Sequence, residues 1–467
     1  MDSIFWFKAF ELIVSLSILV FVHELGHFMW ARFFKVGVEK FYLFFDVYNF
    51  AILRWNKQGL HLFDLIHFPR LVNPSETEYG IGWVPLGGYC AIVGMIDETH
   101  DAEHADMDRP DAFVKQGKFA QFMIMVGGVL NNVILAVLIY IGMAWHWGAD
   151  IVTLDKLPNP YYSEYAQQIG FHEGDVIVSV DGKTVDYGSL PNALLLGNEV
   201  KVRRSTPENG EEIVSIALPD TIGTYFLRNQ KELARFLQPR MPMVVRGING
   251  DDSPAASAGL AAGDSIIAVW SASDSITIVT PDIDDVKAQL AMHAGDSLRL
   301  IFVRNREQMQ ADIMVKADST IGIIINTQLP AHCLTHINYN LIEAIPAGIE
   351  RGWNTLYNYV RQFKLVFTKE GAQSVGGFGT MGSIFPEEWV WKAFWSLTAF
   401  ISVALAFMNI LPIPALDGGH ILILIIEAII RRPLSDKVKD VLQYIGFGFI
   451  ILLMILANLN DIIRFFF

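Results

Sequence analysis

The residues with the clearest capacity for chemistry lie at positions 22–27, which read Val-His-Glu-Leu-Gly-His. His23 and His27 are four residues apart, so on a helix both imidazoles lie on one face and can bind one metal ion. Glu24 would lie beside that metal, where a carboxylate can take a proton from bound water. The pattern predicts a zinc site with Glu24 as its base.

This motif lies at the end of an apolar run, residues 12–22. A His-Glu-x-x-His pattern is short and occurs by chance, but burying its side chains in a membrane is costly unless they have a function. The run could instead belong to a secretory signal peptide. Asp2, Glu11 and the lack of a small-residue cleavage site argue against this, and we interpret the run as a retained membrane helix.

Composition and hydropathy predict several membrane spans. The chain has 467 residues, of which 52% are hydrophobic, and its mean hydropathy is positive; both are high for a soluble globular protein. The length suggests three or more domains. Four apolar runs have the length of about twenty residues that crosses a bilayer. They are residues 4–27, continuing as a helix towards residue 34, and residues 119–145, 391–411 and 441–459.

Shorter apolar segments and the charges limit the other possibilities. Residues 421–430 are too short for a span and contain Glu427, so they predict a buried or interfacial helix, and residues 353–367 predict an amphipathic one. The net charge of −14 is spread along the chain without a basic stripe, which excludes nucleic-acid partners. The two cysteines, Cys90 and Cys333, exclude a disulfide framework or a cysteine-based zinc finger.

Basic residues in the loops predict the orientation. Lysines and arginines gather between the first and second spans and between the third and fourth, which places both loops in the cytoplasm. Both termini and the long central region, residues 147–345, then lie outside.

The central region contains an internal repeat. Residues 165–182 and 253–270 each read as a short helix, a glycine, a small loop, a Gly-Asp pair and an alternating apolar strand. This spacing resembles PDZ domains of the bacterial type, which bind extended peptide ends by strand addition. We expect peptide binding or steric gating; the alternative is two small β-domains that merely pack against the membrane part.

Catalytic zinc sites usually have three protein ligands, so a third must come from elsewhere in the chain. Asp417 is the best donor, because it follows two prolines that break the third span, and irregular backbone at membrane depth is tolerated where it lines a polar cavity. Asp417 could also cap a helix that starts at Gly418. His420 is a further possible ligand, but we favour a supporting or packing role.

Together these motifs resemble the site-2 protease family, and more narrowly its bacterial regulator of sigma-E protease branch, over essentially the whole chain. The resemblance implies that His23, His27 and Asp417 bind one Zn²⁺ and that Glu24 is general base and acid. It also implies that Asn409, in an Asn-x-x-Pro-x-x-x-Leu-Asp-Gly motif that includes Pro412, helps to hold the substrate or the developing oxyanion. The family cleaves transmembrane helices of anti-sigma factors or remnant signal peptides.

A helical substrate must unwind before it is cut, because its carbonyls are internally bonded. Residues 77–94 alternate like a strand around Gly87 and Gly88 and resemble the family's membrane-associated β-loop, which clamps substrate in extended form. The alternative is a plain cytoplasmic hairpin. The chain departs from the family in an insertion at residues 41–76, part of which we expect at the membrane interface, and in residues 374–384, which lack the family's Gly-Pro dipeptide.

The expected fold is a polytopic α-helical membrane protein with about four transmembrane helices, a membrane-associated β-loop and two inserted β-rich PDZ domains. We expect it in the bacterial inner membrane, with the PDZ domains on the periplasmic side and the active site near the cytoplasmic side. The predicted parts are an N-terminal membrane part (1–146), two PDZ-like domains (147–238 and 239–330), an amphipathic connection (331–390) and a C-terminal membrane part (391–467).

Two other functions compete with intramembrane proteolysis of single-span membrane proteins. A catalytically silent, membrane-anchored PDZ scaffold has no use for the base Glu24. A metal-coupled transporter is disfavoured by only four good spans.

Overall fold

The computed structural model describes residues 3–95, 108–158, 160–206, 210–250, 252–271, 277–279, 282–327 and 329–466. The chain forms two compact units. The first combines Met1–Ala149 with Asn338–Phe467, and the second is Asp150–Ile337. The second unit is thus an insertion between the two halves of the first, and each is described by itself.

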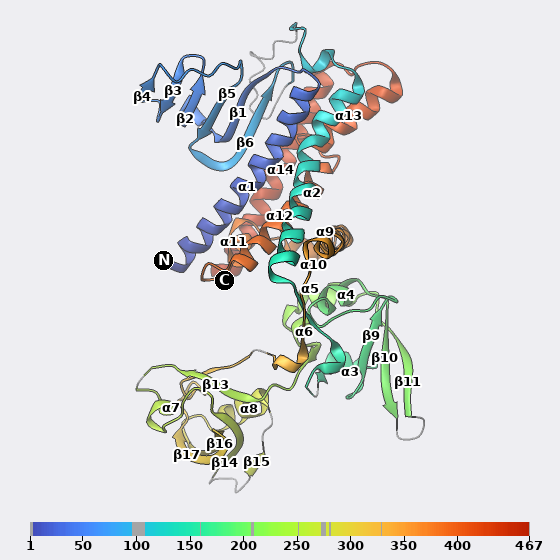
Figure 1. Ribbon diagram of the computed structural model, residues 1–467. Helices are drawn as coiled ribbons and strands as arrows, with labels where there is room; N and C mark the ends of the chain where they lie inside the picture. The colour runs from blue at the N-terminus through green and yellow to red at the C-terminus, as the bar shows by residue number, and fades with distance from the viewer. Residues whose placement is uncertain are drawn as a thin grey trace. The chain divides into compact units, whose positions relative to one another are not determined.

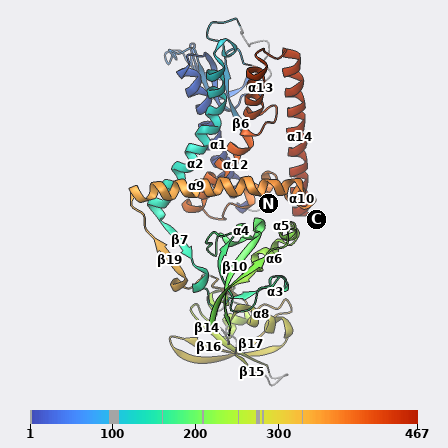
Figure 2. The same cartoon turned by 90° about the vertical axis from the view of Figure 1, so that its right-hand side faces the viewer.

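Four long helices dominate the first unit (Figures 1 and 2). Within the described residues these four, and no others, are long and apolar enough to cross a membrane, which confirms the prediction of four spans. The last is the least buried of the four, as expected of a helix that lipid would cover. They are α1 (Ser3–Phe33), α2 (Lys118–Trp147), α12 (Trp391–Ile410) and α14 (Asp436–Phe466).

Helix α2 packs against both α1 and α12. Small residues allow close approach between α1 and α2, since a Cβ at Gly26 would collide with the carbonyl oxygen of Gly127. Across α2 and α12, the Ser402 hydroxyl donates to the carbonyl of Asn132 at 2.8 Å. Gly127 and Asn132 of the second span therefore face protein.

A six-stranded sheet follows α1, with strand order β4-β3-β2-β5-β1-β6. Both β5 and β6 pair with β1, so residues 77–94 are not a plain hairpin, and that alternative is wrong. The insertion supplies β2, β3 and β4, which extend the predicted β-loop into a larger sheet. The strands are β1 (Val38–Phe45), β2 (Ala51–Asn56), β3 (Gly59–Leu62), β4 (Ile66–Phe68), β5 (Glu78–Gly82) and β6 (Val84–Ile92).

Strand β6 is an edge strand, because within the described residues its only strand partner is β1. Apolar side chains fix this side of the sheet to the helices: Phe41 of β1 and Ile92 of β6 belong to one buried cluster with Ile124 of α2. The free edge of β6 therefore has a fixed place against the helical bundle.

A broken segment joins α12 to α13 (Asp417–Ile430). It contains Pro412 and Pro414, which cannot donate in a helix, and Ala415 has a left-handed φ of 77°. Helix α13 begins at Asp417 itself; Leu416 is the N-cap residue, without a side-chain cap bond. Asp417 therefore does not cap a helix that starts at Gly418, and its carboxylate is available for other partners.

The segment before α12 forms several short helices and one long one. These are α9 (Leu341–Phe363), α10 (Lys369–Ser374) and α11 (Phe378–Ser383). Gly348 and Gly352 of α9 pack against α2. Thr380, in the segment that lacks the Gly-Pro dipeptide, donates its backbone N–H to Asp461 of α14 at 2.9 Å.

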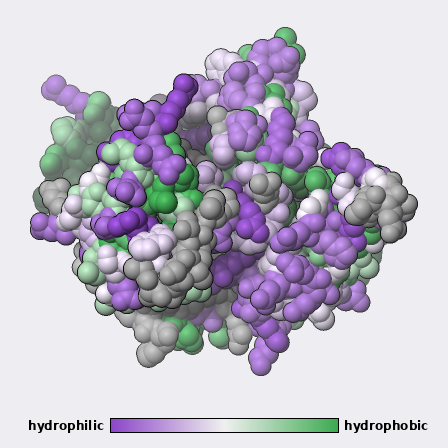
Figure 3. Space-filling model, turned by 90° about the horizontal axis from the view of Figure 1, so that it is seen from below, coloured by the Kyte–Doolittle hydropathy of each residue, from purple (hydrophilic) through white to green (hydrophobic). Residues whose placement is uncertain are grey.

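The second unit contains two buried apolar cores. Helices α4 (Leu190–Leu196), α5 (Ile222–Arg228) and α6 (Gln230–Arg235) belong to the first half, and α8 (Ile283–Met292) to the second. Hydrophilic residues predominate on the face of the molecule shown in Figure 3. The main strands are β9 (Val176–Val180), β10 (Glu199–Thr206) and β11 (Gly210–Ala217) in the first half and β13 (Met243–Ile248), β14 (Ser265–Ser271), β16 (Ser297–Arg304) and β17 (Glu307–Met314) in the second.

The two sequence repeats occupy equivalent places in these halves. Each begins with a short helix, α3 (Glu164–Gln168) or α7 (Pro254–Ser257), whose N-cap serine accepts a backbone N–H at 3.2 Å. Each Gly-Asp pair then places a fully buried carboxylate against an arginine from the neighbouring strand, Asp175 with Arg204 and Asp264 with Arg304, both at 2.7 Å. The repeat is thus structural as well as sequential, while its resemblance to PDZ domains stays a prediction.

Candidate metal centre

Three predicted ligands come together from two distant parts of the chain. His23 and His27 lie on one face of α1, and Asp417 is the first residue of α13. The two Nε2 atoms are 3.2 Å apart, and Asp417 Oδ2 lies 3.2 Å from His23 Nε2 and 3.4 Å from His27 Nε2. Among the described residues, these three form the group whose ligand atoms lie close enough together to hold a metal ion.

This triangle has the dimensions that zinc requires. Tetrahedral zinc with bonds of about 2.0–2.1 Å holds its ligand atoms about 3.3 Å apart. Asp417 Oδ2 is also buried without a hydrogen-bond partner within the described residues. A buried carboxylate oxygen normally has a partner, and a cation held between the three atoms would supply one.

Contacts on the far side of each imidazole orient it. His27 Nδ1 lies 2.8 Å from the carbonyl oxygen of Ile124, so a proton on Nδ1 leaves Nε2 for a metal. His23 Nδ1 lies 3.4 Å from the Asn132 amide, whose Oδ1 is buried without a hydrogen-bond partner within the described residues. With that amide turned over, Oδ1 would accept the Nδ1 proton and likewise leave Nε2 unprotonated.

Gly128 of α2 gives the histidines their space, a role that the sequence interpretation missed. A Cβ at this position would collide with the rings of both His23 and His27. The sequence signal is the Gly127-Gly128 pair, which by itself indicates only close helix packing. The structure shows that Gly127 serves the helix contact, whereas Gly128 faces the site.

Glu24 and the histidines line one cavity of about 60 Å³ with Asp417 and His420. The Asn409 amide lies beside the same site, 3.4 Å from His23 Nε2. Of the other predicted substrate residues, Gly88 lines the cavity. Gly87 and Pro412 are not among the described residues that line it.

Gly87 and Gly88 have packing roles of their own. A Cβ at Gly87 would collide with the ring of Phe45, and one at Gly88 would press on Val20 of α1. The missing side chain at Gly88 therefore lets β6 lie close to the zinc-motif helix, whereas that at Gly87 leaves room for the Phe45 ring.

Helix α13 is anchored at its far end by a buried ion cluster. Glu427 accepts from Lys118 of α2 at 2.5 Å, from Lys439 of α14 at 2.8 Å and from the backbone N–H of Leu434 at 3.0 Å. Three helices thus meet at one carboxylate, which holds α13, and with it Asp417, in place.

Two helical histidines and a carboxylate, with a glutamate in the same cavity, are the residue types that serve as ligands and base in zinc metallopeptidases. The comparisons with known proteins agree. The chain belongs to peptidase family M50, whose family model matches residues 11–453. It is a zinc metalloendopeptidase, and its four apolar helices make it a membrane protein.

Related proteins match nearly the whole chain. A Neisseria meningitidis protein named "Putative zinc metalloprotease" is 28% identical, over 97% of this chain and 98% of its own length. The regulator of sigma E protease of Haemophilus influenzae is 25% identical over 97% and 98%, and that of Salmonella typhi is 27% identical over 99% and 100%. The predicted family resemblance is confirmed.

Proposed function

We propose that this protein cuts peptide bonds within the membrane, using one Zn²⁺ held by His23, His27 and Asp417. The observation that carries the proposal is the triangle of ligand atoms with edges of 3.2–3.4 Å, which lies beside the membrane-length helices α1 and α2 and faces the same cavity as Glu24. Soluble substrates have no need of a site among such helices, so its location favours membrane-embedded ones.

The chain's own residues supply the proton transfers and the positioning. When bound, zinc polarises the scissile carbonyl and lowers the pKa of bound water. Glu24 takes the proton of the attacking water and then delivers it to the leaving nitrogen. The Asn409 amide, next to His23, donates a hydrogen bond to the substrate carbonyl oxygen, whose negative charge grows as the bond breaks.

The substrates we propose are transmembrane segments of single-span proteins, of the anti-sigma-factor or remnant-signal-peptide type. The segment would unwind and add to the free edge of β6, because strand addition replaces the backbone hydrogen bonds that unwinding breaks. Gly88 lines the cavity and is part of this edge. We include Gly87 and Pro412 as neighbouring contacts of a longer substrate.

We further propose that the protein lies in the bacterial inner membrane, with the second unit on the periplasmic side and the metal site near the cytoplasmic side. The basic loops support this orientation. The two halves of the second unit would act as PDZ domains that bind peptide termini or limit access to the membrane part. Their matched architecture and hydrophilic surface support this role.

The test is Glu24→Gln in the purified full-length protein, assayed in detergent with zinc and a single-span reporter protein. We expect cleavage to fall by more than about 100-fold while the bound zinc is retained, because the amide that replaces the carboxylate cannot accept the proton. Glu11→Gln is the matched control, with the same change at a buried position of the same helix, and should leave cleavage unchanged. Equal cleavage by wild type and Glu24→Gln would contradict the mechanism.

Zinc content and cleavage, measured together, distinguish the enzyme from a catalytically silent scaffold. We expect His23→Ala to lose both zinc and cleavage. Wild-type protein that binds zinc but cleaves none of a panel of single-span proteins would favour the scaffold. Retention of zinc by His23→Ala would instead contradict the ligand assignment.

A further inference from the structure

Tyr89 is the first side chain after the two glycines of edge strand β6, and it is anchored on both its ring and its hydroxyl. Its phenol donates to Asp46 Oδ1 at 2.8 Å. Its ring stacks on Tyr42 and on Phe45 of β1, with centroids 5.4 and 6.2 Å apart. Tyr89 also lines the cavity that contains His23 and Glu24.

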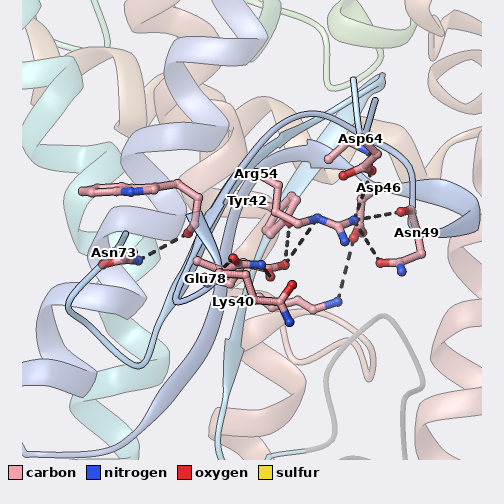
Figure 4. A network of polar contacts seen from close by, with 12 residues as sticks. Lys40, Tyr42, Asp46, Asn49, Arg54, Asp64, Asn73 and Glu78 are labelled. Carbon is pink, nitrogen blue, oxygen red and sulfur yellow. Dashed lines mark hydrogen bonds and ion pairs between the residues drawn. The ribbon is translucent and has the colours of Figure 1, made fainter. Parts of the chain in front are cut away.

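Asp46 follows the last residue of β1, and its Oδ2 lies 3.8 Å from Nζ of Lys40 on the same strand. The strands that the insertion adds hold the turn after Asp46, in which Asn49 has a left-handed φ of 56°. Arg54 of β2 donates to the carbonyl and side-chain oxygens of Asn49 at 2.8 and 3.1 Å. Asp64, after β3, accepts the backbone N–H of Ala51 at 2.7 Å and lies 3.4 Å from Arg54. Figure 4 shows this network from close by.

A second tyrosine in the same stack makes the same kind of bond without being on the edge strand. Tyr42 of β1 donates to Glu78 Oε1 at 2.7 Å, and Asn56 donates to the other oxygen at 2.8 Å. Tyr42 is fully buried, and Tyr89 is 6% exposed. Burial and the carboxylate acceptors raise the pKa of both phenols, so both remain hydrogen-bond donors.

The edge strand depends on this anchor for a physical reason. Gly87 and Gly88 bring no side chains that could fix the backbone, and glycine loses more conformational freedom on folding than other residues. Within the described residues no strand lies on the far side of β6. Tyr89, which directly follows these glycines and lines the same cavity as Glu24, is therefore a side chain that can hold this backbone in place.

We propose that Tyr89 and Asp46 are positioning residues. They hold the edge of β6 in the position at which a substrate strand added to it reaches the metal centre. Asp46 lies in the insertion, residues 41–76, whose Arg54 and Asp64 hold the turn that follows it. This inference rests on the proposed function, since it assumes that substrate adds to β6. It assigns the insertion a part in substrate binding and none in the chemical step.

The test compares Tyr89→Phe with Tyr42→Phe in the full-length protein, using the same single-span reporter. Each variant loses one buried phenol-to-carboxylate bond from the same stack, but only Tyr89 is on the edge strand. We expect Tyr89→Phe to raise KM by about fivefold, the equivalent of one net hydrogen bond, with kcat within about twofold. Tyr42→Phe should lower thermal stability as much as Tyr89→Phe does and leave KM unchanged.

Asp46 variants provide the second arm. Asp46→Asn keeps an oxygen acceptor for the phenol and should restore a KM near that of wild type, whereas Asp46→Ala should match Tyr89→Phe. The KM of the double variant Tyr89→Phe/Asp46→Ala should be no higher than that of either single variant, because both substitutions remove the same hydrogen bond.

Three outcomes would overturn the inference: an unchanged KM in Tyr89→Phe, an equal rise in KM in Tyr42→Phe, or full additivity in the double variant. Cleavage by wild type in these assays distinguishes such a failure from failure of the proposed function. If wild type cleaves no single-span protein, the proposed function fails and this inference falls with it.

Discussion

Carboxylates in the two units of the molecule have different surroundings. In the second unit, Asp175 and Asp264 each receive two hydrogen bonds from one arginine, and each also accepts a backbone N–H, from His172 and Ala261 respectively. In the first unit, Asp417 faces two histidines, and its Oδ2 has no hydrogen-bond partner within the described residues.

The difference separates a structural carboxylate from a binding one. Each arginine also donates to a carbonyl of its own repeat, Arg204 to Gly170 and Arg304 to Gly259, so the cluster is satisfied by protein alone. Such clusters stabilise a fold and need no ligand. Asp417 has no arginine partner of this kind, and its Oδ2 lies 3.2 and 3.4 Å from the Nε2 atoms of two histidines, which is the arrangement expected of a metal ligand.

The strongest test of this comparison is Asp417→Asn, for which we expect the largest effect. The amide lacks the negative charge that binds zinc, so zinc content should fall to background and cleavage by more than about 100-fold. Zinc stabilises the folded state to which it binds. A chelator should therefore lower the unfolding temperature of wild type and leave that of Asp417→Asn unchanged, as thermal scans in detergent would show.

The opposite pattern is expected for Asp175→Ala. Removing this carboxylate leaves the Arg204 charge without its acidic partner. We expect the free energy of unfolding to fall by about 3 kcal/mol, the lower limit for breaking a buried ion pair, because Arg204 keeps some solvent contact. Hydrogen exchange of the full-length protein should show faster opening of β9 and β10, with zinc content and the exchange of α1 unchanged. Loss of zinc in this variant would contradict the division between structural and binding carboxylates.

The smallest expected effect is a pH dependence of stability in the second half of the same unit. Burial alone would raise the pKa of Asp264, but bonds from Arg304 and from the Ala261 N–H bring it below its ordinary value. A carboxyl with a lowered folded pKa gives its full stability above its unfolded pKa of about 4 and loses it as the pH falls through the folded value. We expect Asp264→Asn to open β14 faster than wild type at about pH 6, as hydrogen exchange would measure, with the gap narrowing below about pH 4.

The exposed pair of Arg299 with Asp312 is the matched control for this pH effect. Both of its side chains are more than 40% exposed, so solvent screens the pair. Asp312→Asn should change the exchange of β16 little at either pH. If Asp264→Asn and Asp312→Asn changed hydrogen exchange equally, burial of the carboxylate would not determine how much the ion pair stabilises the fold.

Local patterns were sufficient for much of the architecture. Membrane spans could be predicted because about twenty apolar residues in sequence are needed to cross a bilayer, and the four helices confirm this. The plain-hairpin alternative for residues 77–94 was wrong because strand order depends on partners far along the chain. An alternating pattern predicts a strand but does not say that β1 lies between β5 and β6.

The sequence by itself determined that His23 and His27 share a helix face, because helical periodicity is a local property of the chain. It also indicated Asp417 as the third metal ligand, since a carboxylate that follows two prolines at membrane depth needs a partner. Only the tertiary structure decided that Asp417 Oδ2 lies within 3.4 Å of both histidines, that Gly128 leaves room for their rings and that Tyr89 anchors the adjacent strand. These facts depend on how helices cross and strands pair, and contacts between distant segments leave no periodic signal in the chain.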